Sequence, residues 1–179
     1  MDGARAQAAV GDGGHPPFEA YVRERSEGLV RLAWLVTRNG DDARDAVQDA
    51  LAALYPRWAR LPDGARLEAY VSRSVVNACL AVLRHRRADP VADPSLLVSP
   101  PIGVDHAGRV VEADRVWRWC GELPAVQRAA VVLRFYRDLD YADIAPVLGC
   151  REATARSHVH RAVAAMRARA RAEEDRADG

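Results

Sequence analysis

The feature that most constrains this chain is a pair of helical segments joined by a short turn within residues 138–167. Asp140 suits the N-cap of the first helix, and Gly149 suits the left-handed residue that ends it. The chain restarts as a helix near Arg151 or Glu152 after about three residues, which is the spacing of a helix-turn-helix. The pattern therefore predicts two short helices held at a sharp angle.

The second of these helices has two chemically different faces at about 100° per residue. One face is apolar and holds Ala155, Val159, Ala162 and Met166. The other face holds Ala153, Ser157, His160, Arg161 and Ala164. Small residues let a helix backbone approach DNA, and long donors such as Arg156 and Arg161 reach base edges or phosphates. The pattern predicts a DNA-reading helix, and an ordinary solvated helix face is the alternative.

Composition is that of a soluble globular protein: 179 residues, 49% hydrophobic, 28% charged and a net charge of +1. No apolar run reaches the roughly 18 residues that a membrane span requires, and the N-terminus lacks an export signal. We therefore expect a cytoplasmic protein without membrane insertion. Cys79, Cys120 and Cys150 are widely spaced, so the sequence indicates neither a disulfide framework nor a metal site.

Basic residues gather in two stretches of an otherwise nearly neutral chain. Residues 66–87 hold five arginines against Glu68, a net charge of +4, and residues 151–171 hold six against Glu152, a net charge of +5. Two separate basic patches favour two contacts with a polyanion such as DNA.

Helical periodicity also covers residues 18–87. We expect a first helix over residues 18–37, a second that is capped by Asp41 or Asp42 and runs to Trp58, and a third over residues 67–86. These three helices predict one small domain over residues 14–87.

Residues 88–110 have no helical period and contain four prolines, so we expect a flexible linker there. Its 23 residues span at most about 75 to 80 Å at full extension, which exceeds two turns of B-DNA at about 34 Å each. Helical pattern resumes in a second domain over residues 111–172. The predicted fold is all-α: two small helical domains joined by a Pro-rich linker, the second ending in the helix-turn-helix.

Three motifs in this order resemble the extracytoplasmic-function (ECF) sigma factors of bacterial RNA polymerase, and most of all their SigE-type branch. The motifs are DDARDAVQDALAALYPRW at 41–58, EAYVSRSVVNACLAVLRHRR at 68–87 and LPAVQRAAVVLRFYRDLDYADIAPVLGCREATARSHVHRAV at 123–163. The resemblance covers nearly everything between residues 18 and 171. It implies a subunit that directs core RNA polymerase to specific promoters and aids promoter opening.

The resemblance also implies roles for individual residues. The helix at 41–58 matches the region that docks on core polymerase, with Asp45, Gln48 and Asp49 as its polar contacts. The third helix matches the region that reads the minus-10 element. The resemblance places Asn77 near a flipped base. An amide suits this role because it can both donate to and accept from a base edge. Phosphates would be held by Arg84, Arg86 and Arg87.

Readout of the minus-35 element maps onto the second helix of the helix-turn-helix, at Arg156, Ser157, His160 and Arg161. Two alternatives stand beside these assignments: the acids of 41–58 as a merely solvated face, and Asn77 as an amide bonded within the core. His158 and His160 lie two positions apart on a helix and point about 200° from each other, so they cannot share a metal.

The implied partners are core RNA polymerase and promoter DNA, with an anti-sigma factor as a further candidate. We expect no cofactor, no metal and no enzymatic activity, since no nucleophile or metal setting is recognisable. A stand-alone helix-turn-helix regulator is the alternative function, and the acidic helix at 41–58 speaks against it. The chain departs from the family pattern at Arg44, where a glutamate is usual, and at residues 152–155.

Overall fold

In the computed structural model, which describes residues 16–88 and 110–177, every regular element is a helix. The α-helices are α1 (Phe18–Thr37), α2 (Gly40–Leu54), α3 (Gly64–Ala88), α4 (Val110–Gly121), α5 (Ala125–Val131), α6 (Tyr141–Leu148) and α7 (Glu152–Ala177). A 3-10 helix, η1 (Tyr55–Arg60), continues α2, and a π-helix, η2 (Val132–Tyr136), continues α5.

The all-α prediction is confirmed, and most predicted helices begin and end within three residues of their observed bounds. Of the linker expected over residues 88–110, residues 89–109 lie outside the described part of the chain, while its two end residues belong to α3 and α4. Within the described residues, no helix combines the length and the apolar character needed to cross a membrane.

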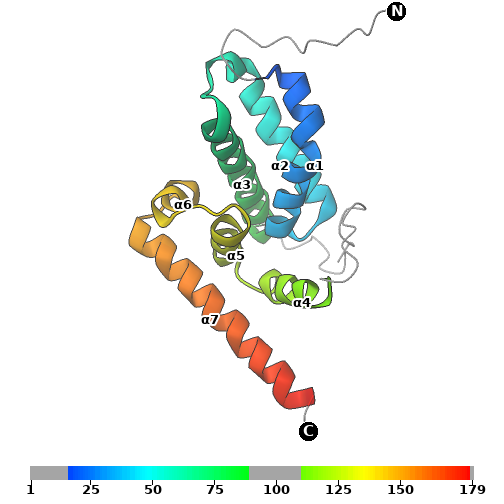
Figure 1. Cartoon of the computed structure of the whole chain (residues 1–179), viewed down its shortest axis with the longest axis vertical. Coiled ribbons are helices and arrows are strands. Elements are labelled where there is room, and N and C mark those ends of the chain that lie inside the picture. Colours follow the sequence, from blue (N-terminus) through cyan, green and yellow to red (C-terminus); the bar gives the residue numbers. More distant parts are fainter. Residues whose placement is uncertain (1–15, 89–109, 178–179) are drawn as a thin grey trace, which may run out of the picture.

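Helices α1, α2 and α3 pack side by side as a bundle (Figure 1). One apolar stripe along α2 and η1 is buried in this bundle: Ala43, Val47, Ala50, Leu51, Leu54 and Trp58. Trp58 of η1 joins the end of the second helical segment to the start of α1, since its indole Nε1 donates to the carbonyl oxygen of Pro16 at 3.0 Å. The ring of Phe18 meets the Trp58 ring edge-on at 5.1 Å.

The cap of α2 differs from the prediction. Asn39, not Asp41 or Asp42, is the N-cap, and its Oδ1 accepts from the backbone N–H of Asp41 at 2.9 Å and of Asp42 at 3.0 Å. Asn39 has an extended backbone, so its short side chain reaches back over the first turn. Both aspartates therefore lie inside the first turn, where the positive end of the helix dipole favours them.

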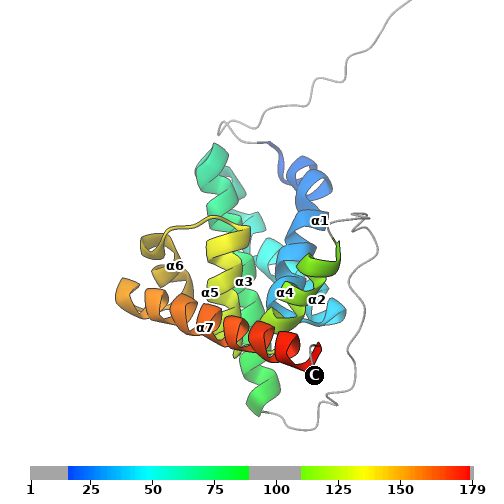
Figure 2. The same cartoon turned by 60° about the horizontal axis from the view of Figure 1, so that its bottom comes forward.

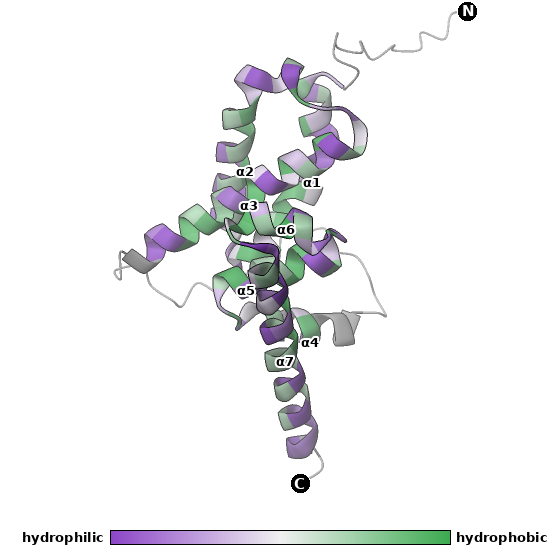
Figure 3. Cartoon of the chain, turned by 90° about the vertical axis from the view of Figure 1, so that its left-hand side faces the viewer, coloured by the Kyte–Doolittle hydropathy of each residue, from purple (hydrophilic) through white to green (hydrophobic). Residues whose placement is uncertain are grey.

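Helices α4 to α7 form the second unit, with α5, α6 and the first half of α7 in mutual contact. Gly149 ends α6 with φ of 64°, as predicted for a left-handed C-cap. Asp140 occupies the N-cap position of α6 with an extended backbone, but its side chain makes no capping hydrogen bond. Helix α7 continues as a single rod past α5 and α6 (Figure 3), and its second half contacts α4, where Trp119 Nε1 donates to Glu173 Oε1 at 2.6 Å.

The two units pack against each other, with α5 and α6 lying beside α3 in two views (Figures 1 and 2). Buried residues of both units, from Leu32 and Val36 to Cys120, Leu133 and Ile144, belong to one continuous core. We call this packing the closed arrangement. It brings the helix-turn-helix next to the helix whose sequence matches the minus-10 region.

Candidate nucleic-acid interface

Helix α7 separates its two faces as the sequence predicts. Ala155, Val159 and Ala162 are buried against the second unit. The four residues assigned to minus-35 readout are all exposed: Arg156, Ser157, His160 and Arg161. Gly149 turns the chain sharply between the two helices. Helix α6 therefore contacts α7 without covering this exposed face. The described residues thus present a polar, arginine-bearing helix face of the kind that fits a major groove.

Neighbouring side chains hold Arg156 in place. Its Nη2 lies 3.1 Å from Glu152 Oε1, one turn earlier on α7. Its guanidinium carbon also lies 5.0 Å from the ring centroid of Tyr141, the first residue of α6. Ser157 donates its hydroxyl to the Ala153 carbonyl at 2.8 Å, so the hydroxyl oxygen remains able to accept.

Helix α3 carries the residues assigned to the minus-10 element. Asn77 is exposed, so the alternative of an amide bonded within the core is wrong. Arg84 is also exposed, although its Nε donates to the Leu80 carbonyl at 3.3 Å. Arg87 lies in the last turn of α3, and its side chain falls outside the described part.

Arg86 is paired within the protein in the closed arrangement. Its Nη2 lies 2.9 Å from Oδ1 of Asp42, whose side chain is only 10% exposed. Burial raises the pKa of Asp42 above the usual value of an aspartate, and the Arg86 guanidinium pulls that pKa back down. A phosphate contact through this Nη2 would therefore require the ion pair to be exchanged, whereas the other guanidinium donors of the 43% exposed side chain take no part in the pair.

The residues assigned to polymerase docking form one exposed face of α2. Asp45, Gln48 and Asp49 are all exposed, and their spacing of three and four residues places them side by side. Ala46, Val47 and Ala50 on the other side of the helix are buried. The face is accessible in the closed arrangement, and a merely solvated helix face would have the same exposure.

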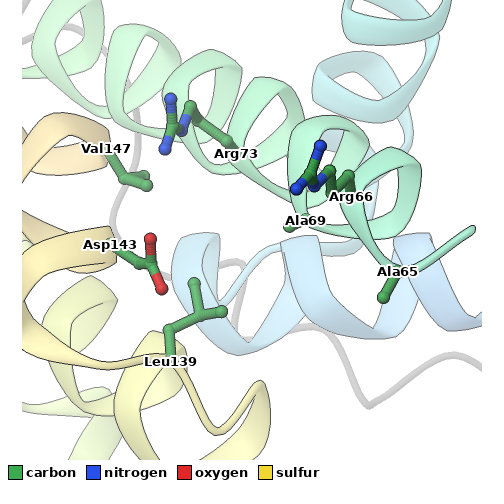
Figure 4. A pocket seen from close by; sticks show the side chains of 7 residues that line it. All are labelled: Ala65, Arg66, Ala69, Arg73, Leu139, Asp143 and Val147. Atoms are coloured by element: carbon green, nitrogen blue, oxygen red, sulfur yellow. The ribbon is translucent and has the colours of Figure 1, made fainter. Parts of the chain in front are cut away.

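A cleft of about 250 Å³ lies beside the contact between α3 and α6, and it is lined by residues of both helices. Figure 4 shows Arg66 and Arg73 on the α3 wall and Asp143 and Val147 on the α6 wall. Beside it, Glu68 of α3 lies 3.4 Å from Arg25 Nε of α1 and 3.9 Å from Arg137 Nη2 of the second unit. The acid of the basic α3 patch thus pairs with arginines of α1 and of the second unit.

Sequence reasoning missed Arg128, the buried cation where the two units meet. This arginine of α5 is 7% exposed, and its guanidinium donates to carbonyl oxygens of both units. A signal was present, because Arg128 interrupts the apolar run AVQRAAVVL on a face that is otherwise buried. A charged residue at such a position requires several partners that the sequence does not identify.

Two cysteines lie in the apolar interior between the helices. Burial raises the pKa of the Cys79 thiol to about 12 and that of the Cys120 thiol to about 11. Both therefore stay protonated at neutral pH and fill space as small apolar groups.

Comparison with known proteins assigns a family to this geometry. Residues 21–88 match the family model of sigma-70 region 2, and residues 115–166 match that of sigma-70, region 4. The two matched segments correspond to α1–α3 and to the unit that ends in the helix-turn-helix.

Named relatives agree with both matches over most of the chain. The RNA polymerase sigma-E factor of Streptomyces coelicolor is 34% identical over 152 residues, which cover 84% of each chain. The ECF RNA polymerase sigma factor SigM of Mycobacterium tuberculosis is 37% identical over 149 residues, 83% of this chain and 74% of SigM.

A solved structure shares the fold. The sigma factor RpoE of Bartonella quintana, in complex with the anti-sigma factor NepR, gives a TM-score of 0.63 at 23% identity, covering 83% of this chain and 93% of that one. A region 2 match also distinguishes this chain from a stand-alone helix-turn-helix regulator, which needs no such domain. The chain belongs to the ECF sigma factors of bacterial RNA polymerase, the subunits that direct core polymerase to promoters.

Proposed function

We propose that three exposed surfaces divide the work of promoter recognition in this sigma factor. The acidic face of α2 (Asp45, Gln48 and Asp49) docks on core polymerase. Helix α3 receives the opened minus-10 strand through Asn77, Arg84, Arg86 and Arg87. Helix α7 reads the minus-35 element through Arg156, Ser157, His160 and Arg161. The subunit acts by binding, without catalytic chemistry of its own, and works in the cytoplasm where core polymerase is.

The observation that carries this proposal is the exposed face of α7. Four polar residues, two of them arginines, lie on it, while the buried face consists of small apolar residues. Arginine at a major-groove surface suits bidentate contacts to guanine or contacts to phosphates. The net charge of +5 over residues 151–171 adds a favourable field for DNA.

The proposed function also requires the closed arrangement to open. The minus-10 and minus-35 elements lie about 25 base pairs apart, which is roughly 85 Å along B-DNA. In the closed arrangement α6, the neighbour of α7, packs directly on α3, so both elements cannot be reached at once. The 21 residues between α3 and α4 extend to at most about 70 to 75 Å, which is of the same order as this separation.

Promoter binding by holoenzyme reconstituted from core polymerase and the full chain tests the proposal. Arg156→Ala or Arg161→Ala should weaken binding by about 1 to 3 kcal/mol and relax the base preference in the upstream element. Arg171→Ala is the matched control: Arg171 is exposed on the same helix, but lies 15 residues beyond Arg156, or about 22 Å along the helix. The control should retain the base preference, and any loss of affinity from removing one charge of the basic patch should be equal for all upstream sequences.

A loss of binding that is equal for all upstream sequences would show that Arg156 or Arg161 contacts phosphates only. Unchanged binding in both alanine variants would remove α7 as the reading helix.

A further inference from the structure

Tyr141, the first residue of α6, lies between two arginines that come from other elements. The guanidinium carbon of Arg156, on α7, is 5.0 Å from the Tyr141 ring centroid. That of Arg134, on η2, is 5.7 Å from the same centroid. Both distances lie within the roughly 6 Å over which a cation is attracted to an aromatic face.

The two arginines are held differently. Arg134 is anchored to the main chain, because its Nη1 donates to the Leu139 carbonyl at 3.2 Å. Arg156 has a 55% exposed side chain, and its other contact is the equally exposed carboxylate of Glu152. An exposed ion pair on one helix restrains a side chain weakly. The Tyr141 ring is therefore the one firm surface against which the Arg156 guanidinium rests among the described residues.

Orientation of this guanidinium matters for base recognition. An arginine that reads a guanine must place both of its donors in the plane of the base edge. A freely rotating side chain loses rotamer entropy on binding, and a side chain already held against a flat ring loses less.

We propose that Tyr141 is a positioning residue for minus-35 readout, whose ring holds the Arg156 guanidinium in a groove-ready orientation. This inference rests on the proposed role of Arg156 in reading DNA. In this inference the face of the Tyr141 ring orients the guanidinium, and the phenol oxygen takes no part. A direct bond from the Tyr141 hydroxyl to a DNA phosphate is the competing possibility, and the two make opposite predictions for phenylalanine.

The test uses reconstituted holoenzyme and promoter duplexes in which each upstream base pair is changed in turn. The variants are Tyr141→Phe, Tyr141→Leu, Arg156→Ala and the double variant Tyr141→Leu with Arg156→Ala. Phenylalanine keeps the ring and should keep the base preference of the wild type. Leucine removes the ring and should lower discrimination about threefold to fivefold, only at the base pairs where Arg156→Ala also loses it. In the Arg156→Ala background, Tyr141→Leu should change the discrimination between base pairs by less than about a further twofold.

Several outcomes would overturn the inference. If Tyr141→Phe loses the preference, the hydroxyl does the work, and this result is informative even where the leucine variant folds poorly. If leucine costs as much in the Arg156→Ala background as in the wild type, Tyr141 acts independently of Arg156. If Arg156→Ala itself leaves every preference unchanged, the proposed role of Arg156 fails first, so the two failures are distinguishable.

Discussion

The Nε of Arg128 donates a hydrogen bond of 2.6 Å to the carbonyl oxygen of Val36, 92 residues earlier in the chain. Val36 lies in the last turn of α1, where carbonyl groups have no partner within the helix. The same guanidinium donates through Nη1 to the carbonyls of Gly121 at 2.7 Å and Leu123 at 3.3 Å. One buried side chain thereby joins region 2 to the start of region 4.

A second contact at this junction depends on a glycine. A Cβ at Gly121 would lie 3.0 Å from Nε of Arg38, the residue that ends α1 with φ of 61°. Arg38 in turn stacks over the Trp34 ring, with its guanidinium carbon 3.9 Å from the ring centroid. A side chain at position 121 would therefore require the Arg38 side chain to shift by a few tenths of an ångström.

Replacing Arg128 by methionine should destabilise the free chain and loosen the closed arrangement. Methionine keeps the apolar length but leaves three carbonyl groups without their charged donor, which should lower the free energy of unfolding by about 2 to 4 kcal/mol. Urea unfolding measures this loss, and small-angle X-ray scattering should show a larger radius of gyration under native conditions.

Arg171→Met is the control for that experiment, because it removes an equal charge from an exposed position. It should change the free energy of unfolding by less than about 0.5 kcal/mol. An Arg128→Met variant as stable and as compact as the wild type would refute the role of Arg128 in joining the two units.

The Asp42–Arg86 ion pair predicts a specific dependence of stability on pH. Because burial raises the pKa of Asp42 in the folded chain, the unfolded chain loses this proton at a lower pH. The free energy of unfolding of the wild type, relative to that of Asp42→Asn, should therefore fall as pH rises from about 4 to the raised pKa of Asp42. Above that pKa the difference should level off. Chemical denaturation at a series of pH values measures the difference.

Asp41→Asn serves as the matched change for this titration, since Asp41 is the adjacent aspartate but its side chain is 82% exposed. A parallel pH dependence in wild type and Asp42→Asn would exclude Asp42 as the group responsible. Freed from its partner in Asp42→Asn, Arg86 should also bind DNA phosphates more readily, which a mobility-shift assay at low salt would register.

Charge reversal on α2 tests polymerase docking. Asp45→Arg together with Asp49→Arg should weaken binding to core polymerase by about tenfold or more, because like charges would then face each other across the interface. A pull-down with core polymerase gives the readout. Glu24→Arg together with Glu27→Arg makes the same change in net charge at exposed positions of α1 and should bind normally. Equal binding of core polymerase by both double variants would show that the α2 acids form only a solvated helix face.

Asn77 is predicted to act only after the DNA strands separate. Asn77→Ala should leave binding to the upstream element intact but reduce open-complex formation about fivefold to tenfold, since the lost hydrogen bonds exist only with an unstacked base. Permanganate footprinting of thymines near the start site measures opening, and a mobility-shift assay measures total binding. Equal opening in variant and wild type would leave minus-10 contact to the arginines of α3.

Much of the fold followed from local sequence pattern. The bounds of α1 and α6, the left-handed turn at Gly149, and the buried and exposed faces of α7 all matched the prediction. Each depends on side chains three or four residues apart, or on the backbone preference of a single residue, and such information is local. The N-cap of α2 was wrong by at least two residues, because asparagine and aspartate are equally good N-caps, and the helix begins early enough for Asn39 to accept from the N–H groups of Asp41 and Asp42.

Other features depended on contacts between residues distant in sequence. The periodicity of α3 and α5 shows that each has a buried face, but it carries no information about which helix covers that face. Packing alone decided that Arg128 donates to Val36, that Arg86 pairs with Asp42, and that Arg156 rests on Tyr141. The sequence by itself determined the helices and the family of this sigma factor. Only the tertiary structure decided which of its arginines are exposed to solvent and which are occupied within the protein, because a buried or paired charge depends on partners that any local pattern leaves open.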